Sequence, residues 1–374
     1  MGGVSMEWKE ITLGEIAIFK TGKLNSNAAI SNGEYPFFTC SPETLRINNY
    51  AFDQEAILLA GNNADGNFSI KYYKGKFNAY QRTYVITPIR GKVDIKFLYY
   101  ALSLCLKQFK NMSQGTSTKF LTVTILNSFS VQLPSISDQH RIASILSSLD
   151  RKIELNNKIN ADLEEMAQAI FKNWFVDFEP FKDGKFVDSE LGMIPEGWEV
   201  GSLGDFCNVF TGKKNTNQAI EKGLYPFFSC APEPLASNDA IFNGKAIIIA
   251  GNGSYTGRTS FYNGGFDLYQ RTYACTIREQ DKENLMIFFY HMMKQFFEPV
   301  KMGGTRGSSI PYIVMGDITQ QKFPYSEEWL IRFSNIVNSM MDRKLRIDKE
   351  NSRLSLLRDT LLPRLMSGEL EVPE

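Results

Sequence analysis

Apolar residues recur at alternating steps of three and four in two long stretches of the chain, with charged residues between them. One stretch covers residues 138 to about 172, and the other covers about 327 to 362. This spacing is typical of helices that bury one narrow apolar seam against a partner helix. Ser137 or Asp138 suits the start of the first helix, and Pro363 is expected to end the second.

Neither narrow seam would be stable alone, so the pattern predicts two long antiparallel helices that form an intramolecular coiled coil. Asparagines fall on the predicted seam, where buried amides weaken a coiled coil but fix its register. The alternative is that these asparagines face solvent on loosely wound helices. The predicted seam positions are Leu146, Leu149, Ile153, Asn156, Asn160 and Leu163 in the first helix, and Ile347, Asn351, Leu354 and Leu361 in the second.

The sequence ahead of each long helix alternates short apolar runs with turns rich in Gly, Asn and Asp. Runs of this length and composition predict strands, and two longer apolar segments predict buried helices. The fold class is therefore mixed α/β (α+β). The predicted strands include Ala56–Ala60, Thr83–Thr87, Ala246–Ala250 and Thr272–Ile277, and the predicted buried helices are Lys96–Phe109 and Asn284–Phe297.

These two globular stretches are copies of each other. Residues 8–43 align without a gap with residues 198–233, and 18 of these 36 positions are identical. The motifs YPFF, TGK, AGN and YQRTY occur in both copies. A period of this length indicates a duplicated domain rather than a solenoid. The predicted order is a first domain over 1–137, a helix and connector over 138–197, a second domain over 198–325, and a distal helix with a tail over 326–374.

Composition and charge limit the kinds of partner that the chain can be expected to bind. The formal net charge is zero, but residues 1–137 hold 14 Lys and Arg against 9 Asp and Glu, whereas residues 138–196 hold 7 against 12. A basic first copy followed by an acidic helix suits a protein whose repeats meet a polyanion. The five scattered cysteines form no CxxC pair, so no metal site is expected. No stretch is long and apolar enough for a membrane span, and a reduced cytoplasmic location is expected.

The sequence contains few candidate catalytic residues. The two histidines, His140 and His291, have no counterpart in the other copy and are expected to be structural. The segment GNGSYTGRT at 251–259 resembles a phosphate-binding loop, but its spacing is wrong and an arginine stands where a lysine belongs. The chain is therefore expected to bind no cofactor and to be no enzyme.

Residues kept in both copies should serve what the copies share. The aromatic YPFF motif is expected to lie in the core rather than to stack on bases. The basic pairs Lys23 with Lys213 and Arg82 with Arg271 are candidates for phosphate contacts, with structural ion pairs as the alternative.

The copies differ most in the loops that follow these shared motifs. The loops are rich in Asn, Ser, Thr, Lys and Arg, which are side chains that read base edges in the major groove. Neutral variation in solvent-exposed loops is the alternative. Arg258 and Arg306, which have no basic counterpart in the first copy, are candidate readers of guanine. The other predicted contact residues in these loops are Asn25, Asn62, Asn63, Thr118 and Lys119 in the first copy, and Asn215, Asn252, Tyr255 and Ser308 in the second.

Four stretches resemble the specificity subunit of type I restriction-modification systems. They are ISDQHRIASILSSLDRKIELNN (136–157), AIFKNWFVDFEPF (169–181), LGMIPEGWEV (191–200) and LLPRLMSGELEV (361–372). The resemblance also covers QGTSTKFL (114–121) and the two-copy layout. The second long helix matches the family pattern less well than the first.

The resemblance implies two target-recognition domains that each read one half of a bipartite site on double-stranded DNA. It implies that the long helices separate these domains, set the spacer and dock modification subunits, two of them in the expected assembly. Those partners would bind S-adenosylmethionine and methylate adenine, and added restriction subunits would make an ATP-dependent nuclease. A stand-alone sequence-specific regulator is the alternative.

Two like domains on an antiparallel helix pair would be related by a pseudo-twofold axis, as the two strands of DNA are. Their half-sites are then expected about one helical turn apart. The DNA target is therefore expected to be partly an inverted repeat.

Overall fold

The computed structural model describes residues 7–297 and 311–372. By their contacts these residues divide into two compact units. Unit 1 combines the chain up to Asn156 with the chain from Glu350 onward, and unit 2 comprises Asn157–Lys349. The predicted domains follow the order of the sequence, whereas each compact unit joins one globular region to parts of both long helices.

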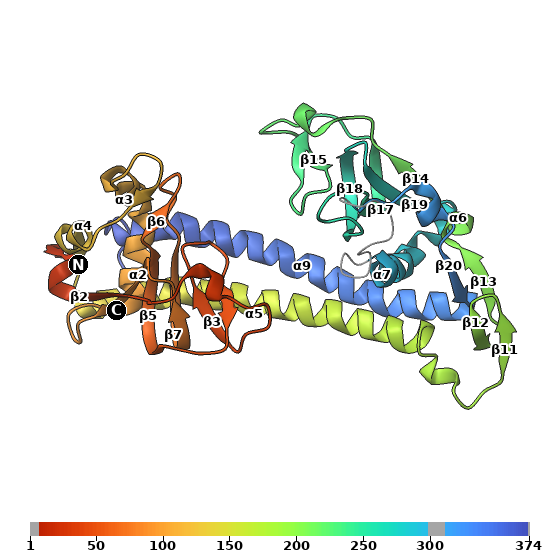
Figure 1. Ribbon diagram of the computed structural model, residues 1–374, viewed down its shortest axis with the longest axis horizontal. Coiled ribbons are helices and arrows are strands. Elements are labelled where there is room, and N and C mark those ends of the chain that lie inside the picture. Colours follow the sequence, from red (N-terminus) through yellow and green to blue (C-terminus); the bar gives the residue numbers. More distant parts are fainter. Residues whose placement is uncertain (1–6, 298–310, 373–374) are drawn as a thin grey trace, which may run out of the picture. The chain divides into compact units, whose positions relative to one another are not determined.

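Unit 1 contains a mixed sheet of six strands among its described residues (Figure 1). β7 pairs antiparallel with β5 and parallel with β3, and a glycine at Gly75 with φ of 133° lies within β7. Phe38, Phe77 and Ala79 pack on Ala56 and Leu58 of β5, so the sheet curls over one of its own faces. In spatial order the strands are β2 (Ala17–Thr21), β8 (Thr83–Pro88), β5 (Phe52–Ala60), β7 (Ile70–Ala79), β3 (Tyr35–Phe38) and β4 (Leu45–Ile47).

Unit 2 repeats this strand order in its own sheet. Its central antiparallel pair, β17 with β18, matches β5 with β7, and β15 again pairs parallel with β18. The matching order confirms the predicted duplication and the mixed α/β class. The strands are β14 (Cys207–Thr211), β19 (Thr272–Ile277), β17 (Phe242–Ala250), β18 (Thr259–Leu268), β15 (Tyr225–Phe228) and β16 (Leu235–Ser237).

Each unit also contains short helices and separate two-stranded sheets. β1 pairs with β10 in unit 1 and β13 pairs with β20 in unit 2, each beside a one-turn helix that a Thr or Ser caps. The bounds in unit 1 are β1 (Lys9–Thr12), α1 (Leu13–Ile16), η1 (Ser26–Ala28), β6 (Asn62–Asn63), β9 (Lys119–Phe120), α4 (Val123–Ser128) and β10 (Ser130–Leu133). In unit 2 they are η2 (Glu179–Phe181), β11 (Phe186–Ser189), β12 (Gly192–Pro195), β13 (Glu199–Ser202), α6 (Leu203–Phe206), η3 (Thr216–Gln218), α8 (Met315–Thr319) and β20 (Lys322–Tyr325).

One buried helix covers a face of each sheet, as predicted, but with different ends. In unit 1 the expected helix over 96–109 is two helices, α2 (Ile95–Leu104) and α3 (Leu106–Met112), which meet at Cys105. The turn at Cys105 lets Phe109 reach Phe129, with ring centroids 4.6 Å apart. In unit 2 a 3-10 turn, η4 (Gln280–Leu285), precedes α7 (Met286–Phe297).

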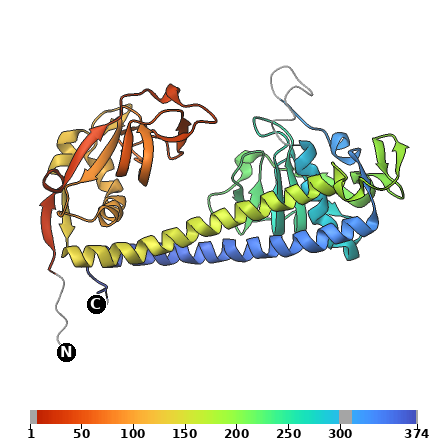
Figure 2. The ribbon, with the colours of Figure 1, turned by 90° about the horizontal axis from the view of Figure 1, so that it is seen from below.

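The two long helices are α5 (Ile136–Phe175) and α9 (Glu327–Met366). In unit 1 the start of α5 lies beside the end of α9, and in unit 2 the end of α5 lies beside the start of α9 (Figure 2). In unit 1 Asp150 bonds Arg358 and Asn156 bonds Asn351, so a rising residue number in α5 meets a falling number in α9. In unit 2 Asn160 bonds Asp348 and Phe171 packs on Phe333, which gives the same relation. The helices are therefore antiparallel in each unit.

Two predicted helix ends were wrong. Ser135 rather than Ser137 or Asp138 caps α5, because its hydroxyl accepts from the backbone N–H of Asp138 at 3.2 Å. Pro363 does not end α9, which runs on to Met366. Proline cannot donate a backbone N–H bond to the preceding turn, but the later bond from the Ser367 N–H to the Pro363 carbonyl at 3.0 Å is kept. Leu365 is buried in the core of unit 1, and this packing holds the last turn helical.

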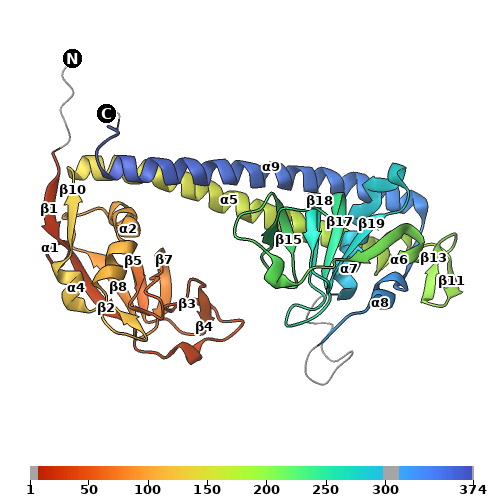
Figure 3. The ribbon, with the colours of Figure 1, turned by 90° about the horizontal axis from the view of Figure 1, so that it is seen from above.

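Each core includes side chains from the long helices. Ile142 and Leu146 of α5 pack with Phe97 of α2 in unit 1, where α2 lies between the sheet and the long helices (Figure 3). The C-terminal segment enters the same core through Leu365 and Val372. In unit 2, aromatic side chains of α5, α7 and α9 pack together through Phe171, Phe175, Phe288 and Phe333. In the shared YPFF motif Phe37 and Phe227 are fully buried, so its aromatic rings contribute to the core as predicted.

Gly368 offers a local test of how the C-terminal segment is held. Its φ is 75°, and an added Cβ would lie 2.6 Å from Nε1 of Trp8. We expect Gly368→Ala to lower the free energy of unfolding by about 1–3 kcal/mol, because a left-handed non-glycine residue is strained and the indole must move. Chemical denaturation measures the change. Gly316→Ala, in α8 where a Cβ would meet no atom within 4 Å, is the control and should not destabilise the protein.

His291 lies in α7 and is fully buried. Its Nδ1 lies 2.9 Å from Oε1 of Gln168, while Nε2 is buried with no hydrogen-bond partner among the described residues. Burial lowers the pKa of His291 to about 4, although the nearby Glu164 carboxylate opposes this shift. The histidine is therefore neutral in the folded protein at neutral pH, in keeping with the predicted structural role.

This buried histidine should make stability depend on pH. Between pH 6.5 and 4 the unfolded chain binds a proton at His291 that the folded protein does not, so the free energy of unfolding falls as pH falls through this window. The loss from pH 7 to pH 5 should be about 2 kcal/mol. His291→Asn, which retains a donor toward Gln168, should remove most of this slope in denaturation measured at both pH values. His140→Asn, at the exposed histidine, should keep it.

Candidate nucleic-acid interface

The loops that carry the shared motifs meet in unit 1. Leu24 forms a bridge with Tyr80, and the backbone N–H of Gln81 donates to the Leu24 carbonyl at 2.9 Å. A Cβ on Gly22 would lie 1.7 Å from the Ala79 carbonyl oxygen, so only glycine permits this close approach of the two chains. The TGK and YQRTY motifs, whose first residues are 59 positions apart, therefore form one surface.

This surface carries exposed basic and amide side chains. Lys23 and Arg82 are both exposed, as is Asn25, whose Oδ1 accepts from Nε2 of Gln81 at 2.7 Å. The second copy has the same arrangement: Lys213 and Arg271 are exposed, and Nε2 of Gln270 donates to Oδ1 of Asn215 at 2.6 Å. The shared basic residues thus lie at matching places in two copies of one loop pair, each beside a pair of bonded amides.

A second loop of unit 1 borders the same surface. The backbone N–H of Gly61 donates to the Arg82 carbonyl at 2.8 Å, and β6 places Asn62 and Asn63 opposite Phe120 and Lys119. Asn63 is committed to its own turn, since its Oδ1 accepts from two backbone N–H groups at 2.9 and 3.0 Å. Asn62 and Lys119 are half-buried and Thr118 is exposed.

The corresponding loop of unit 2 is held differently. The backbone N–H of Gly251 donates to the Arg271 carbonyl at 2.9 Å, and Asn252 forms a bridge with Tyr312. Asn252 also accepts from the Cys230 thiol at 2.9 Å, while Tyr255 is exposed. Arg258 is half-buried and donates to the backbone carbonyls of Ala231 and Pro232, the latter at 2.8 Å. Burial lowers the pKa of the Arg258 guanidinium.

In unit 1 a pocket lies beside the surface formed by the TGK and YQRTY motifs. It has a volume of about 680 Å³ and is lined by Lys23, Leu24, Asn49 and Asn78, among others. Asn78 donates to Oδ1 of Asn49 at 2.9 Å.

An ion cluster stands at the matching place in unit 2. Nζ of Lys214 lies 2.6 Å from Asp267, 2.7 Å from Asp239 and 3.1 Å from the Ser237 hydroxyl. Burial would raise the pKa of Asp267, but hydrogen bonds from Lys214 and Ser237 outweigh it and leave the pKa lowered. Lys214 and Asp239 therefore replace Leu24 and Asn49 of the first copy, and Asp267 replaces Asn78.

The helix pair carries polar contacts where the seam was predicted. Asn156 is 1% exposed, and its Nδ2 donates to Glu350 at 2.9 Å and to Asn351 at 2.8 Å. In unit 2 the Nδ2 of Asn160 donates to Asp348 at 2.6 Å. These asparagines do not face solvent. Of the other predicted seam residues, Leu146 and Ile347 are buried, and Leu149, Ile153, Leu163, Leu354 and Leu361 are half-buried.

A sequence model of the type I restriction modification DNA specificity domain matches residues 6–165 and 195–326. The chain belongs to this family.

Individual proteins to which the chain is similar are specificity subunits of the same family. The chain is 38% identical over 218 residues to the type I restriction enzyme EcoDI specificity subunit of Escherichia coli, a match that covers 53% of this chain and 48% of the relative. It is 29% identical over 312 residues to the MjaIX specificity subunit of Methanocaldococcus jannaschii, covering 77% and 72%. The chain thus spans about half the length of the first of these relatives.

The fold is also that of a solved family member. A crystal structure of the type I restriction-modification S subunit from M. genitalium superposes with a TM-score of 0.63 at 17% identity, over 100% of this chain and 98% of the other. At this identity the likeness establishes the fold alone. No helix in the described part of the chain is long and apolar enough to cross a membrane.

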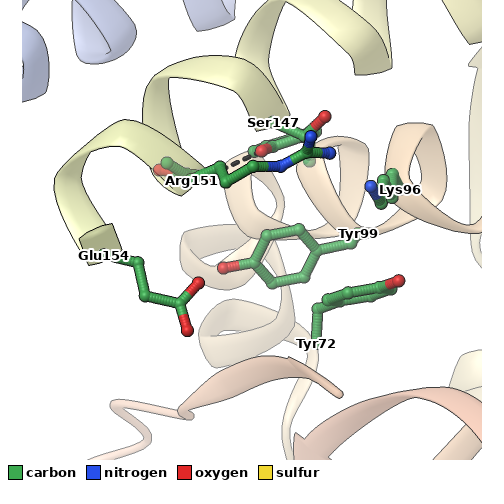
Figure 4. Close-up of a pocket in the computed structure, with 8 residues that line it drawn as sticks. Tyr72, Lys96, Tyr99, Ser147, Arg151 and Glu154 are labelled. Atoms are coloured by element: carbon green, nitrogen blue, oxygen red, sulfur yellow. Dashed lines mark hydrogen bonds between the residues drawn. The ribbon is translucent and has the colours of Figure 1, made fainter. Parts of the chain in front are cut away.

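A polar recess of about 350 Å³ lies where the first specificity domain meets α5 (Figure 4). Tyr72 of β7 and Tyr99 of α2 line one side, and Arg151 and Glu154 of α5 line the other. Asp150 and Tyr100 also line the recess, and Asp150 accepts from the Tyr100 hydroxyl at 2.5 Å and from Arg358 of α9 at 2.8 Å. Burial and the bond to Asp150 raise the pKa of Tyr100. These contacts fasten the domain to both helices within unit 1.

The structure gathers some predicted contact residues of the specificity domains and not others. Those at or beside the shared loop pairs are Lys23, Asn25, Asn62, Arg82, Thr118 and Lys119 in unit 1, and Lys213, Asn215, Asn252, Tyr255 and Arg271 in unit 2. Arg258 is bound to backbone carbonyls and Asn63 to its own turn, so both serve loop structure as they stand. Arg306 and Ser308 lie outside the described residues.

Sequence reasoning missed Gln81 and Gln270. Both lie inside the repeated YQRTY motif, so their recurrence was visible. Only the fold showed that each one bonds an asparagine of the other shared loop.

The ion cluster of unit 2 predicts a graded effect on stability. Lys214→Leu leaves Asp267, which is 4% exposed, without its cation and should lower the free energy of unfolding by about 2–4 kcal/mol. Adding Asp239→Asn and Asp267→Asn installs the first copy's residues and should restore most of that loss, because no buried charge remains. Denaturant titration of the single and triple variants tests this. Equal stability of the two variants would show that the buried charge contributes nothing.

Proposed function

We propose that this chain is the DNA-reading subunit of a type I restriction-modification assembly. Each globular domain reads one half of a bipartite site on double-stranded DNA. The supporting observation is the duplicated surface, where exposed Lys and Arg side chains flank bonded amides at matching places in both copies. Basic side chains hold phosphates, and amides read base edges. A stand-alone regulator is not favoured, because the relatives of the chain are specificity subunits.

In this proposal the chain itself is not an enzyme. Modification subunits bind S-adenosylmethionine and methylate adenine, and restriction subunits, where they join, bind ATP. The chain supplies the sequence readout and holds these partners on the site. The names of the relatives, which are subunits of restriction enzymes, support this division of labour.

The long helices offer apolar side chains for such partners. In unit 1 Leu155 is 52% exposed, Leu356 is 69% exposed and Leu357 is 47% exposed. In unit 2 Met166 and Leu345 are exposed on the same two helices. Exposed leucines on a helix pair already packed along its seam suit docking of further subunits. Because each unit offers such side chains, two modification subunits are proposed.

The proposal makes helix length the determinant of the spacer between half-sites. Seven residues inserted into both helices, after Asn157 in α5 and before Lys349 in α9, would keep the heptad seam and lengthen each helix by about 10 Å. Mapping methylated adenines in cells that carry the chain and its modification partner should give one interrupted motif for the wild type. The insertion should lengthen its spacer by about three base pairs and leave both halves unchanged.

Insertion into α5 alone is the control, because it displaces the seam residues of one helix only. This variant is expected to lose methylation. A methylated motif whose spacer stays constant in the doubly extended variant would refute the role of the helices, and a wild type without an interrupted motif would refute the proposed function.

A further inference from the structure

A hydrogen bond between two exposed amide side chains occurs at the proposed DNA surface of both copies. Asn25 bonds Gln81 at 2.7 Å, and Asn215 bonds Gln270 at 2.6 Å. All four side chains are exposed. The neighbouring loops differ between the copies, as Leu24 and Lys214 show, yet the amide pair is kept in both.

Among the described residues, each pair leaves a defined set of polar atoms without a bonded partner. The glutamine Nε2 donates to the asparagine Oδ1 in both copies, so the asparagine carbonyl is occupied. The asparagine Nδ2 remains as a donor and the glutamine Oε1 remains as an acceptor. One donor and one acceptor side by side match the major-groove edge of adenine, which offers N7 as acceptor and N6 as donor. Guanine offers two acceptors, cytosine a donor, and thymine an acceptor with a methyl group.

The backbone holds both pairs in place before any ligand arrives. The backbone N–H of Gln81 donates to the Leu24 carbonyl at 2.9 Å, and that of Gln270 donates to the Lys214 carbonyl at 3.0 Å. In unit 2 the backbone N–H of Asn215 also donates to Gln218 at 2.7 Å. A fixed amide pair loses little conformational freedom on binding, which favours a specific contact. Exposed Lys23 and Arg82, or Lys213 and Arg271, stand on the same loops to hold the backbone of the nucleic acid.

We infer that each amide pair reads an adenine, at the same position of the two half-sites. The inference rests on the proposed function and adds the residues and the base. It also specifies how the two halves of the target are alike. Each half has one adenine, the two adenines lie on opposite strands, and each is read by an amide pair that the two copies share. Positions read by the differing loops are free to differ.

Asn25→Asp and Asn215→Asp test the inference most sharply. Aspartate keeps an oxygen that accepts from the glutamine but replaces the outward donor by an acceptor, so the pair persists while its match to adenine is lost. Asn27→Asp and Asn217→Asp are matched controls, because they add the same charge to an exposed position of the same loop without replacing a member of the pair. The purified chain with its modification subunit is incubated with a randomised DNA duplex library, and bound duplexes are sequenced.

The wild type should select an interrupted motif with adenine at equivalent positions of both halves. Asn25→Asp should reduce the preference for that adenine about 10-fold or more in one half only, and Asn215→Asp should do so in the other half. The controls should lower binding to all sequences and leave the motif intact.

Other results would overturn the inference. A bipartite motif without a shared adenine, or aspartate variants that behave like their controls, would reduce the pairs to loop clamps and leave the proposed function standing. A wild type that selects no bipartite motif would remove the proposed function and the inference together.

Discussion

Neither globular region of this protein has a complete core of its own. The helix that covers each sheet, α2 or α7, has apolar side chains on the face turned away from the sheet, and the long helices bury that face. Ile142 and Leu146 of α5 do so in unit 1, and Phe171 of α5 with Phe333 of α9 do so in unit 2. Burying such side chains is the largest favourable contribution to folding, so the helices are part of each domain rather than connectors between domains. The surface loops of each domain are therefore held in place relative to the parts of the long helices in the same unit.

The need to complete the core of unit 1 also explains why the C-terminal residues pack against the first domain. Leu365 in the last turn of α9 and Val372 beyond it enter the core that also contains Leu13 and Leu126. The left-handed backbone at Gly368 lets the chain turn beneath Trp8. Unit 1 therefore requires both ends of the described sequence.

Duplication divided the residues of this family member into two classes. Contacts between backbones are shared, such as the close approach at Gly22 and at Gly212, because they build the loop pair itself. One set of side-chain contacts differs as a whole: where the first copy has Leu24, Asn49 and Asn78, the second has Lys214, Asp239 and Asp267. A buried charge is costly without its partner, so such positions can change only in concert. The amide pairs belong to the shared class although they contribute little to either core.

The heptad spacing, the duplication and the mixed α/β class followed from the sequence alone, because hydrophobic periodicity and self-similarity are local or linear properties. Seam positions such as Asn156 could be assigned for the same reason. The ends of the helices could not: Pro363 continues a helix because Leu365 is buried by residues far away in sequence. The roles of the loop residues also depended on the fold. Arg258 was a plausible reader of guanine until carbonyls from a loop 26 residues away were found to bind it. Gln81 became a candidate only when folding placed it against Asn25, 56 residues earlier, since a hydrogen bond between distant residues leaves no period in the sequence.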